Sequence, residues 1–129
     1  MTKEQIFAAF AYDMACADGS LSKEEANRIG LLASANNLDV SAVVEAIKKE
    51  IEQPSNLKEV VSLMTDDDKD LVFFAAKRIS MADGKIASNE VKKLHHYCKL
   101  FGWGAQYVTI EYFKLLKENP SLSVEGVDF

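Results

Sequence analysis

The stretch MACADGSLSKEE, at residues 14–25, recurs as ISMADGKIASNE at residues 79–90, which is 65 positions further along the chain. In both copies Ala-Asp-Gly is followed by an aliphatic residue and then by a glutamate, and weaker matches continue at the same spacing. Self-similarity at one fixed spacing indicates a repeated structural unit. The sequence therefore predicts a single domain over residues 1–129, built by duplication from about 3–52 and 66–118 with a short connector helix at 55–64.

Apolar residues recur along the chain at steps of three and four, which is the spacing of one face of an α-helix. Val, Ile and Thr nowhere alternate with polar residues over a strand length, and only 6 glycines and 2 prolines punctuate the chain. The sequence predicts an all-α fold without β-sheet, with seven helices in two pseudo-symmetric halves and a frayed tail after Pro120. The expected helices cover residues 3–17, 22–36, 56–64, 66–81 and 88–101, together with one that begins at Ser41 and one that ends at Asn119.

Two helix starts are marked by residues that cap a helix. Ser22 can accept the backbone N–H of Glu25 while the Glu25 carboxylate reaches back to the Ser22 backbone, which forms a capping box. Thr65 precedes an acidic run at residues 66–68, and carboxylates are favoured at the positive, N-terminal end of a helix. The helix dipole therefore explains this acidic run without a ligand.

The run at residues 71–76 is apolar at every position, so we expect its helix to be the central one, packed from several sides. Phe101 and Trp103 flank Gly102 at a helix junction, and we expect both aromatic rings to pack in the core. The other residues expected in the core are Phe10, Ile29, Phe74, Ile79, Leu94 and Cys98.

The composition excludes several classes of protein. Fifteen Lys and Arg residues against 20 Asp and Glu leave a net charge of −5, which argues against nucleic acid as a partner. No apolar run approaches the roughly 20 residues that a membrane span needs, and Lys3 and Glu4 interrupt any signal-peptide pattern. Cys16 and Cys98 lie in apolar helical patterns without a redox motif. We therefore expect a cytoplasmic protein that does not insert into a membrane.

The repeated turn resembles one family of known proteins. Its residues are Ala17, Asp18, Gly19, Leu21 and Glu25 in the first copy, and Ala82, Asp83, Gly84, Ile86 and Glu90 in the second. In these features the sequence resembles the tellurite-resistance TerB-like family, which also includes the N-terminal domain of the DjlA co-chaperones. The resemblance implies a compact all-α fold of two related helical halves, acidic residues that bind metal ions, and no enzymatic activity. The chain lacks a J-domain signature and in this respect differs from full-length DjlA.

Asp18 and Asp83 recur at the C-terminal ends of helices, where the helix dipole makes a carboxylate mildly unfavourable. A structural explanation is an Asx turn, in which the side chain accepts backbone N–H groups that follow the glycine. A functional explanation is cation binding, because Asp, Gly and Glu in each copy match positions five, six and twelve of an EF-hand loop. Positions one and three fall on residues such as Met14 and Cys16, which excludes a true EF-hand but leaves open a simpler site completed by water.

Three further carboxylates belong to the candidate metal sites. Glu25 is explained by its capping box, whereas Glu90 faces Ala87, which has no hydroxyl to cap with, so Glu90 is the better functional candidate. Asp13 lies one turn before Ala17 and can join Asp18. We expect weak binding of a divalent cation of the Ca or Mg class by five carboxylates: Asp13, Asp18, Glu25, Asp83 and Glu90.

The motifs do not support catalysis. His95 and His96 are adjacent, so their side chains diverge by about 100° on a helix and cannot chelate one ion together; at least one is expected at the surface. The sequence contains no GxSxG, P-loop or HExxH pattern. An enzyme acting through paired carboxylates would need a pocket that joins Glu90 to another acid.

Two functions therefore stay open at the level of sequence. One is a non-enzymatic, cytoplasmic TerB-like module of the stress or tellurite response, which binds a divalent cation or a protein partner through its acidic turns. The alternative is a protein-interaction or co-chaperone-like adaptor whose groove between the two halves binds a helix, with Asp18 and Asp83 serving structure only.

Overall fold

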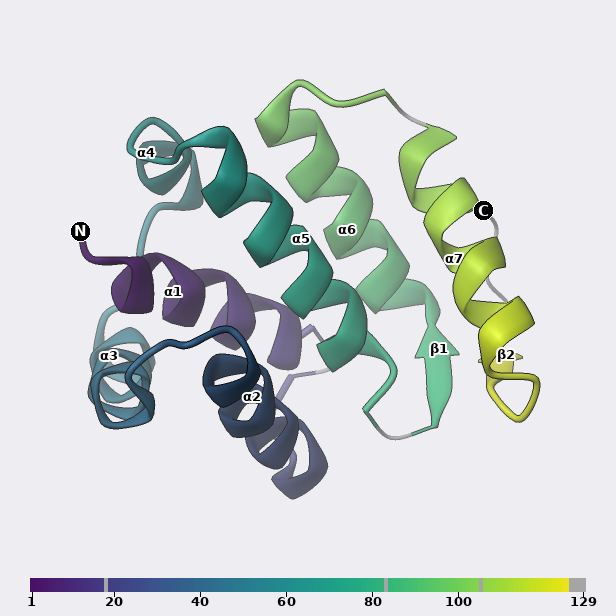
Figure 1. Cartoon of the computed structure of the whole chain (residues 1–129), viewed down its shortest axis with the longest axis horizontal. Helices are drawn as coiled ribbons and strands as arrows, with labels where there is room; N and C mark the ends of the chain where they lie inside the picture. Colours follow the sequence, from purple (N-terminus) through teal and green to yellow (C-terminus); the bar gives the residue numbers. More distant parts are fainter. Residues whose placement is uncertain (18, 83, 105, 126–129) are drawn as a thin grey trace.

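The computed structural model of the chain describes residues 1–125 apart from 18, 83 and 105, with side chains described as far as Leu122. These residues form seven α-helices and two short strands, drawn in Figure 1. The elements are α1 (Lys3–Ala15), α2 (Lys23–Ala35), α3 (Val40–Glu52), α4 (Leu57–Val61), α5 (Asp66–Ser80), β1 (Lys85–Ala87), α6 (Ser88–Phe101), α7 (Gln106–Glu118) and β2 (Ser123–Glu125). The expected all-α fold with seven helices is confirmed, while its origin in a duplication stays a prediction.

The capping residues identified in the sequence begin and end their helices as expected. Ser22 Oγ accepts the Glu25 N–H at 3.1 Å, and Glu25 Oε1 accepts the Ser22 N–H at 2.9 Å. Thr65 makes the same reciprocal pair with Asp68 at the start of α5. At the other end, α6 stops at Gly102, whose φ of 77° lies in the left-handed region that glycine adopts without steric cost.

One helix starts earlier than the sequence suggested. The N-cap of α3 is Asp39, whose side chain accepts the Ala42 N–H at 3.2 Å, so Ser41 lies inside the first turn. Asp and Ser are comparably good N-caps, and only the geometry of the preceding turn selects between them. The remaining helix ends lie within two residues of their expected positions, except that α4 covers only Leu57–Val61.

Two helices form the centre of the molecule. α5 packs against α1, α2 and α6, and α1 packs in turn along α3. Figure 1 shows α5 crossing the middle of the molecule between α1 and α6, with α7 on the far side of α6. The central position expected for α5 is confirmed, and α1 shares it because 8 of its 13 residues are buried.

One of the core predictions is wrong. Phe74 is 39% exposed, whereas its neighbour Phe73 is only 3% exposed. Successive helix residues point about 100° apart, so a six-residue apolar run cannot turn every side chain towards the core. The Phe74 ring instead lies beneath two cations, with Lys77 Nζ at 5.8 Å and Arg78 Cζ at 5.1 Å from its centroid. The remaining five expected core residues are buried: Phe10, Ile29, Ile79, Leu94 and Cys98.

A short parallel ribbon corrects the expectation that the fold contains no β-sheet. β1 pairs with β2 in parallel, with Lys85 opposite Ser123 and Ala87 opposite Glu125. Ile86, in the middle of β1, is fully buried and anchors the ribbon to the core. In the described part of the segment after Pro120, residues 123–125 therefore form a paired strand where a frayed tail was expected, and residues 126–129 lie outside the described residues. Three-residue strands are too short to produce a readable alternation of polar and apolar residues.

None of the described helices is long and apolar enough to cross a membrane.

Candidate functional sites

The two acidic turns share their backbone geometry on either side of the aspartates. Gly19 and Gly84 have φ values of 104° and 82°, so both positions require a residue without a Cβ. The Gly19 N–H donates to Cys16 O at 2.9 Å, and the Gly84 N–H donates to Met81 O at 3.1 Å. Asp18 and Asp83 themselves lie outside the described residues, so their role as cation ligands stays a prediction.

The Glu25 side chain lies in the capping box of α2 and is only 5% exposed. Its carboxylate accepts the Ser22 backbone N–H, which is the structural role expected from the sequence. A cation at this position would have to compete with that hydrogen bond.

The Glu90 side chain is also buried, at 7% exposure, in the first turn of α6. Ala87 gives this helix no side-chain cap, as the sequence indicated. Burial raises the pKa of Tyr112 well above its usual range, although a hydrogen bond with Ser80 lowers it, and the negative charge of Glu90 raises it further. The Glu90 carboxylate therefore lies close enough to the Tyr112 phenol of α7 to influence its ionisation.

Asp13 joins α1 to α6. Its Oδ1 accepts a hydrogen bond from Lys93 Nζ at 3.1 Å, and its Oδ2 accepts one from the Tyr97 hydroxyl. Tyr97 is fully buried, and burial together with the charge and hydrogen bond of Asp13 raises its pKa well above the usual range. Both Asp13 oxygens thus have protein donors, which gives this carboxylate a structural role that explains its charge without a metal ion.

Within the described part of the chain, no three His, Cys, Asp or Glu side chains are grouped so that they could hold a metal ion. Asp18 and Asp83 lie outside this part of the chain. His95 is half-buried and His96 is exposed, which confirms that at least one of the two histidines lies at the surface.

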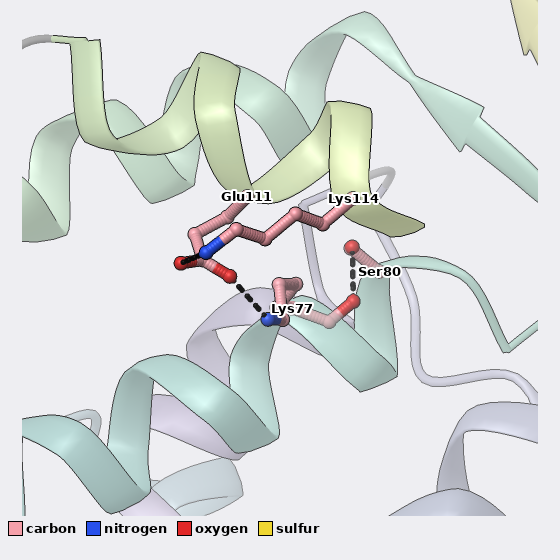
Figure 2. A network of polar contacts seen from close by, with 4 residues as sticks. All are labelled: Lys77, Ser80, Glu111 and Lys114. Atoms are coloured by element: carbon pink, nitrogen blue, oxygen red, sulfur yellow. Dashed lines mark hydrogen bonds and ion pairs between the residues drawn. The ribbon is translucent and has the colours of Figure 1, made fainter. Parts of the chain in front are cut away.

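A largely buried set of polar contacts, called here the polar joint, links α5 to α7, and no local pattern in the sequence indicates it. Figure 2 shows Lys77 of α5 reaching Glu111 of α7, with 2.9 Å between Lys77 Nζ and Glu111 Oε2. Lys114 Nζ lies 3.5 Å from the other oxygen of Glu111. Burial alone would raise the pKa of Glu111, but the hydrogen bond and charge of Lys77, aided by Lys114, hold it below its usual range.

The same joint contains a hydroxyl pair. Ser80 Oγ donates to the Lys77 carbonyl at 2.6 Å, as Figure 2 shows, and lies 2.9 Å from the Tyr112 hydroxyl. These partners are about 30 residues apart in sequence, at separations of 32 and 34. Only the folded arrangement of α5, α6 and α7 brings them together, so no local sequence pattern could have indicated them.

A groove with a mostly apolar lining lies between α2 and α3. It has a volume of about 200 Å³, and the residues that line it include Leu21, Ile29, Gly30, Val40, Val44 and Ile47. Val40 and Val44 are 40% and 46% exposed, although both are large aliphatic side chains. The groove lies inside the first half of the chain, not between the two halves as the adaptor hypothesis supposed.

Gly30 forms part of the floor of this groove. It lies within α2, where glycine costs roughly 0.5–1 kcal/mol relative to alanine. A Cβ placed on Gly30 would meet no atom within 4 Å, so packing inside the chain does not require a glycine here. The missing side chain leaves open space directly above the helix backbone.

The chain gives no match to any family model, curated protein or solved structure with which it was compared. The resemblance to the TerB-like family therefore rests on the repeated turn motif and stays a prediction.

Proposed function

We propose that this chain is a non-catalytic protein-interaction module, and that the groove between α2 and α3 receives the apolar face of an amphipathic helix from a partner protein. The proposal rests on two features of the groove. Val40 and Val44 are exposed on it, and no side chain fills the space beside Gly30. Helix-in-groove recognition uses apolar side chains at helical spacing that enter a groove of this kind.

The apolar character of the groove decides which interaction would supply the affinity. Isolated exposed apolar residues are normal on protein surfaces, but Val40, Val44 and Ile47 share one concave face. Burying an aliphatic side chain contributes roughly 1.5–3 kcal/mol, so two or three such contacts contribute roughly 3–9 kcal/mol before the cost of association is subtracted. We therefore expect weak binding, with the apolar contacts as its main source.

Charge contributes little at the rim. Lys48 pairs with Glu45 at 3.2 Å, and both side chains are more than 60% exposed. Exposed pairs of this type are worth only about 0.2–1 kcal/mol. We therefore expect binding that changes little between low and moderate salt.

The test uses a labelled, designed amphipathic helical peptide with leucines at positions i, i+3, i+4 and i+7, and follows binding by fluorescence anisotropy. Gly30→Leu places a side chain in the groove. Its Cβ would meet no atom within 4 Å, and leucine is the better helix former, so we expect the variant to fold. We expect its affinity to fall at least about tenfold, which corresponds to about 1.4 kcal/mol.

The matched control is Leu31→Ser, at the neighbouring position of α2. Leu31 is 67% exposed and does not line the groove, so this variant should bind the peptide as the wild type does. Equal affinity of Gly30→Leu and wild type would contradict the proposal, as would a loss of binding in the control.

We propose a second function for the acidic turns, because the two turns share one backbone geometry around Gly19 and Gly84. In this proposal Asp18 and Asp83, completed by water, bind a divalent cation of the Ca or Mg class weakly. This is the function that the resemblance to TerB-like modules of the cytoplasmic stress or tellurite response implies.

The decisive experiment for this second function is a calcium, magnesium and manganese titration of the wild type and of the double variant Asp18→Asn with Asp83→Asn, followed by amide shifts. The wild type should respond at the residues that flank both turns, and the variant should not. Equal responses would leave both turns with a purely structural role.

A further inference from the structure

A second hollow lies beside the first turns of α5, away from the α2/α3 groove. It is an open cavity of about 470 Å³ lined by Asp66, Asp70, Trp103, Gly104 and Tyr107. These residues come from the first turns of α5, the segment after α6 and the start of α7. Figure 1 shows the start of α5 beside α4, whereas α2 lies near the other end of α5.

The aromatic wall of this hollow is held in place by buried rings. The centroids of Trp103 and Tyr107 lie 4.9 Å apart, and each ring packs edge-to-face on Phe73, at 5.4 and 5.0 Å. Phe101, which is 7% exposed, supports Trp103 from the other side at 5.1 Å. Trp103 is half-buried and Tyr107 is 36% exposed, so both rings reach the surface from a rigid support. The expectation that Trp103 packs in the core holds only for part of its ring.

Two carboxylates form the facing wall. Asp66 and Asp70 are four residues apart on α5, so they lie on the same face of the helix. Both side chains are exposed. Asp66 Oδ1 lies 3.9 Å from Lys69 Nζ, which is a long distance for an ion pair. Asp70 and Tyr107 line the same hollow, and burial together with the negative charges of Glu111 and Asp70 raises the pKa of Tyr107. The dipole of α5 accounts for the acids alone, but not for two supported aromatic rings beside them.

We propose that this hollow binds the guanidinium group of an arginine side chain presented by a partner protein. A guanidinium is planar, so it can stack on the face of Trp103 or Tyr107 while its N–H groups donate to a carboxylate of Asp66 or Asp70. The ammonium group of lysine is a compact, strongly hydrated charge without this planar fork and gains less from the same surroundings. The site shares no lining residue with the α2/α3 groove, so the two proposals are tested independently.

The chain contains a single tryptophan, and it lies in the proposed site, so binding can be followed directly by Trp103 fluorescence and by its indole N–H signal. The probe is the blocked tripeptide acetyl-Gly-Arg-Gly-amide, compared with the same peptide carrying citrulline or lysine. We expect a saturable response to the arginine peptide that weakens as salt is added. The neutral citrulline peptide, which keeps the shape but not the charge, should give none.

The double variant Asp66→Asn with Asp70→Asn should bind the arginine peptide about tenfold more weakly while keeping the tryptophan probe intact. Asp67→Asn removes one charge from the same helix turn outside the hollow and is the matched control, with affinity expected to stay within about twofold of wild type. The proposal is overturned if the double variant and Asp67→Asn bind alike. It is also overturned if the citrulline or lysine peptide binds as tightly as the arginine peptide, or if neither Trp103 signal responds.

Discussion

α3 and α7 occupy corresponding places in the two predicted copies, but different forces hold them. α3 packs along α1 and buries Val43 and Ala46, and its contact with α2 leaves an apolar groove. α7 is fixed to α5 by the Lys77–Glu111 ion pair and by the Ser80–Tyr112 hydrogen bond. Both helices bury apolar side chains and expose others, among them Val44 of α3 and Phe113 of α7. The difference lies in the directional polar contacts, which fix α7 in place. The comparison shows that long-range polar contacts fix α7, whereas α3 borders the apolar groove proposed to bind a helix.

The largest effect is expected where α5 supports α7. Phe73→Ala removes a buried ring that packs on Trp103 and Tyr107, so it should lower the free energy of unfolding by about 3–5 kcal/mol. Phe74→Ala, on the exposed side of the same helix, should cost less than about 1.5 kcal/mol. Chemical denaturation of both variants measures the two losses of stability. Equal losses would contradict the assignment of Phe73 to the core and of Phe74 to the surface.

The polar joint itself should show the next largest effect. Lys77→Met removes the partner of Glu111 in a pair whose side chains are 11% and 15% exposed, and should cost about 1–3 kcal/mol. The exposed Lys48–Glu45 pair on α3 is the comparison, and Lys48→Met should stay within about 0.5 kcal/mol of wild type. Similar losses of stability in the two variants would contradict the claim that polar contacts stabilise α7 more than α3.

The Lys77–Glu111 ion pair leads us to expect that the stability of the chain depends on pH. Because the pKa of Glu111 is lowered in the folded state, its contribution to stability is complete above the ordinary glutamate value of about 4.3. The contribution is lost as the pH falls through the lowered, folded value. Glu111→Gln lacks this contribution, so its stability deficit against the wild type should be largest at neutral pH and should shrink in acid. Thermal unfolding across the acid range provides the measurement, and a constant deficit would argue against the ion pair.

The smallest effect concerns the groove. Gly30→Ala should stabilise the chain by about 0.5–1 kcal/mol, because alanine has the better helix propensity and its Cβ would enter open space. A destabilised variant would show that the floor of the groove is already filled.

Local chemistry made most helix ends predictable from the sequence. Ser22, Thr65 and Gly102 act through contacts with residues at most four positions away, so their roles can be recognised in the sequence itself. Phe74 was misplaced because the apolar run around it does not say which side faces outward.

Long-range contacts were not predictable in the same way. Asp13 meets Lys93 across 80 residues, and Lys77 meets Glu111 across 34, so only the packing of the helices determines these pairs. The carboxylates of the candidate metal sites were identified from the sequence, but the α2/α3 groove was not, because it depends on how two amphipathic helices pack against each other. A single sequence does not specify the angle between two helices.

The most direct test of the difference between the two halves follows the methyl groups of the valines by NMR while the designed amphipathic peptide is added. Val40 and Val44 border the groove, whereas Val108 of α7 is fully buried. We predict that the signals of Val40 and Val44 shift with saturation and that Val108 does not respond. Shifts at Val108 with unchanged signals from Val40 and Val44 would contradict the assignment of binding to the first half.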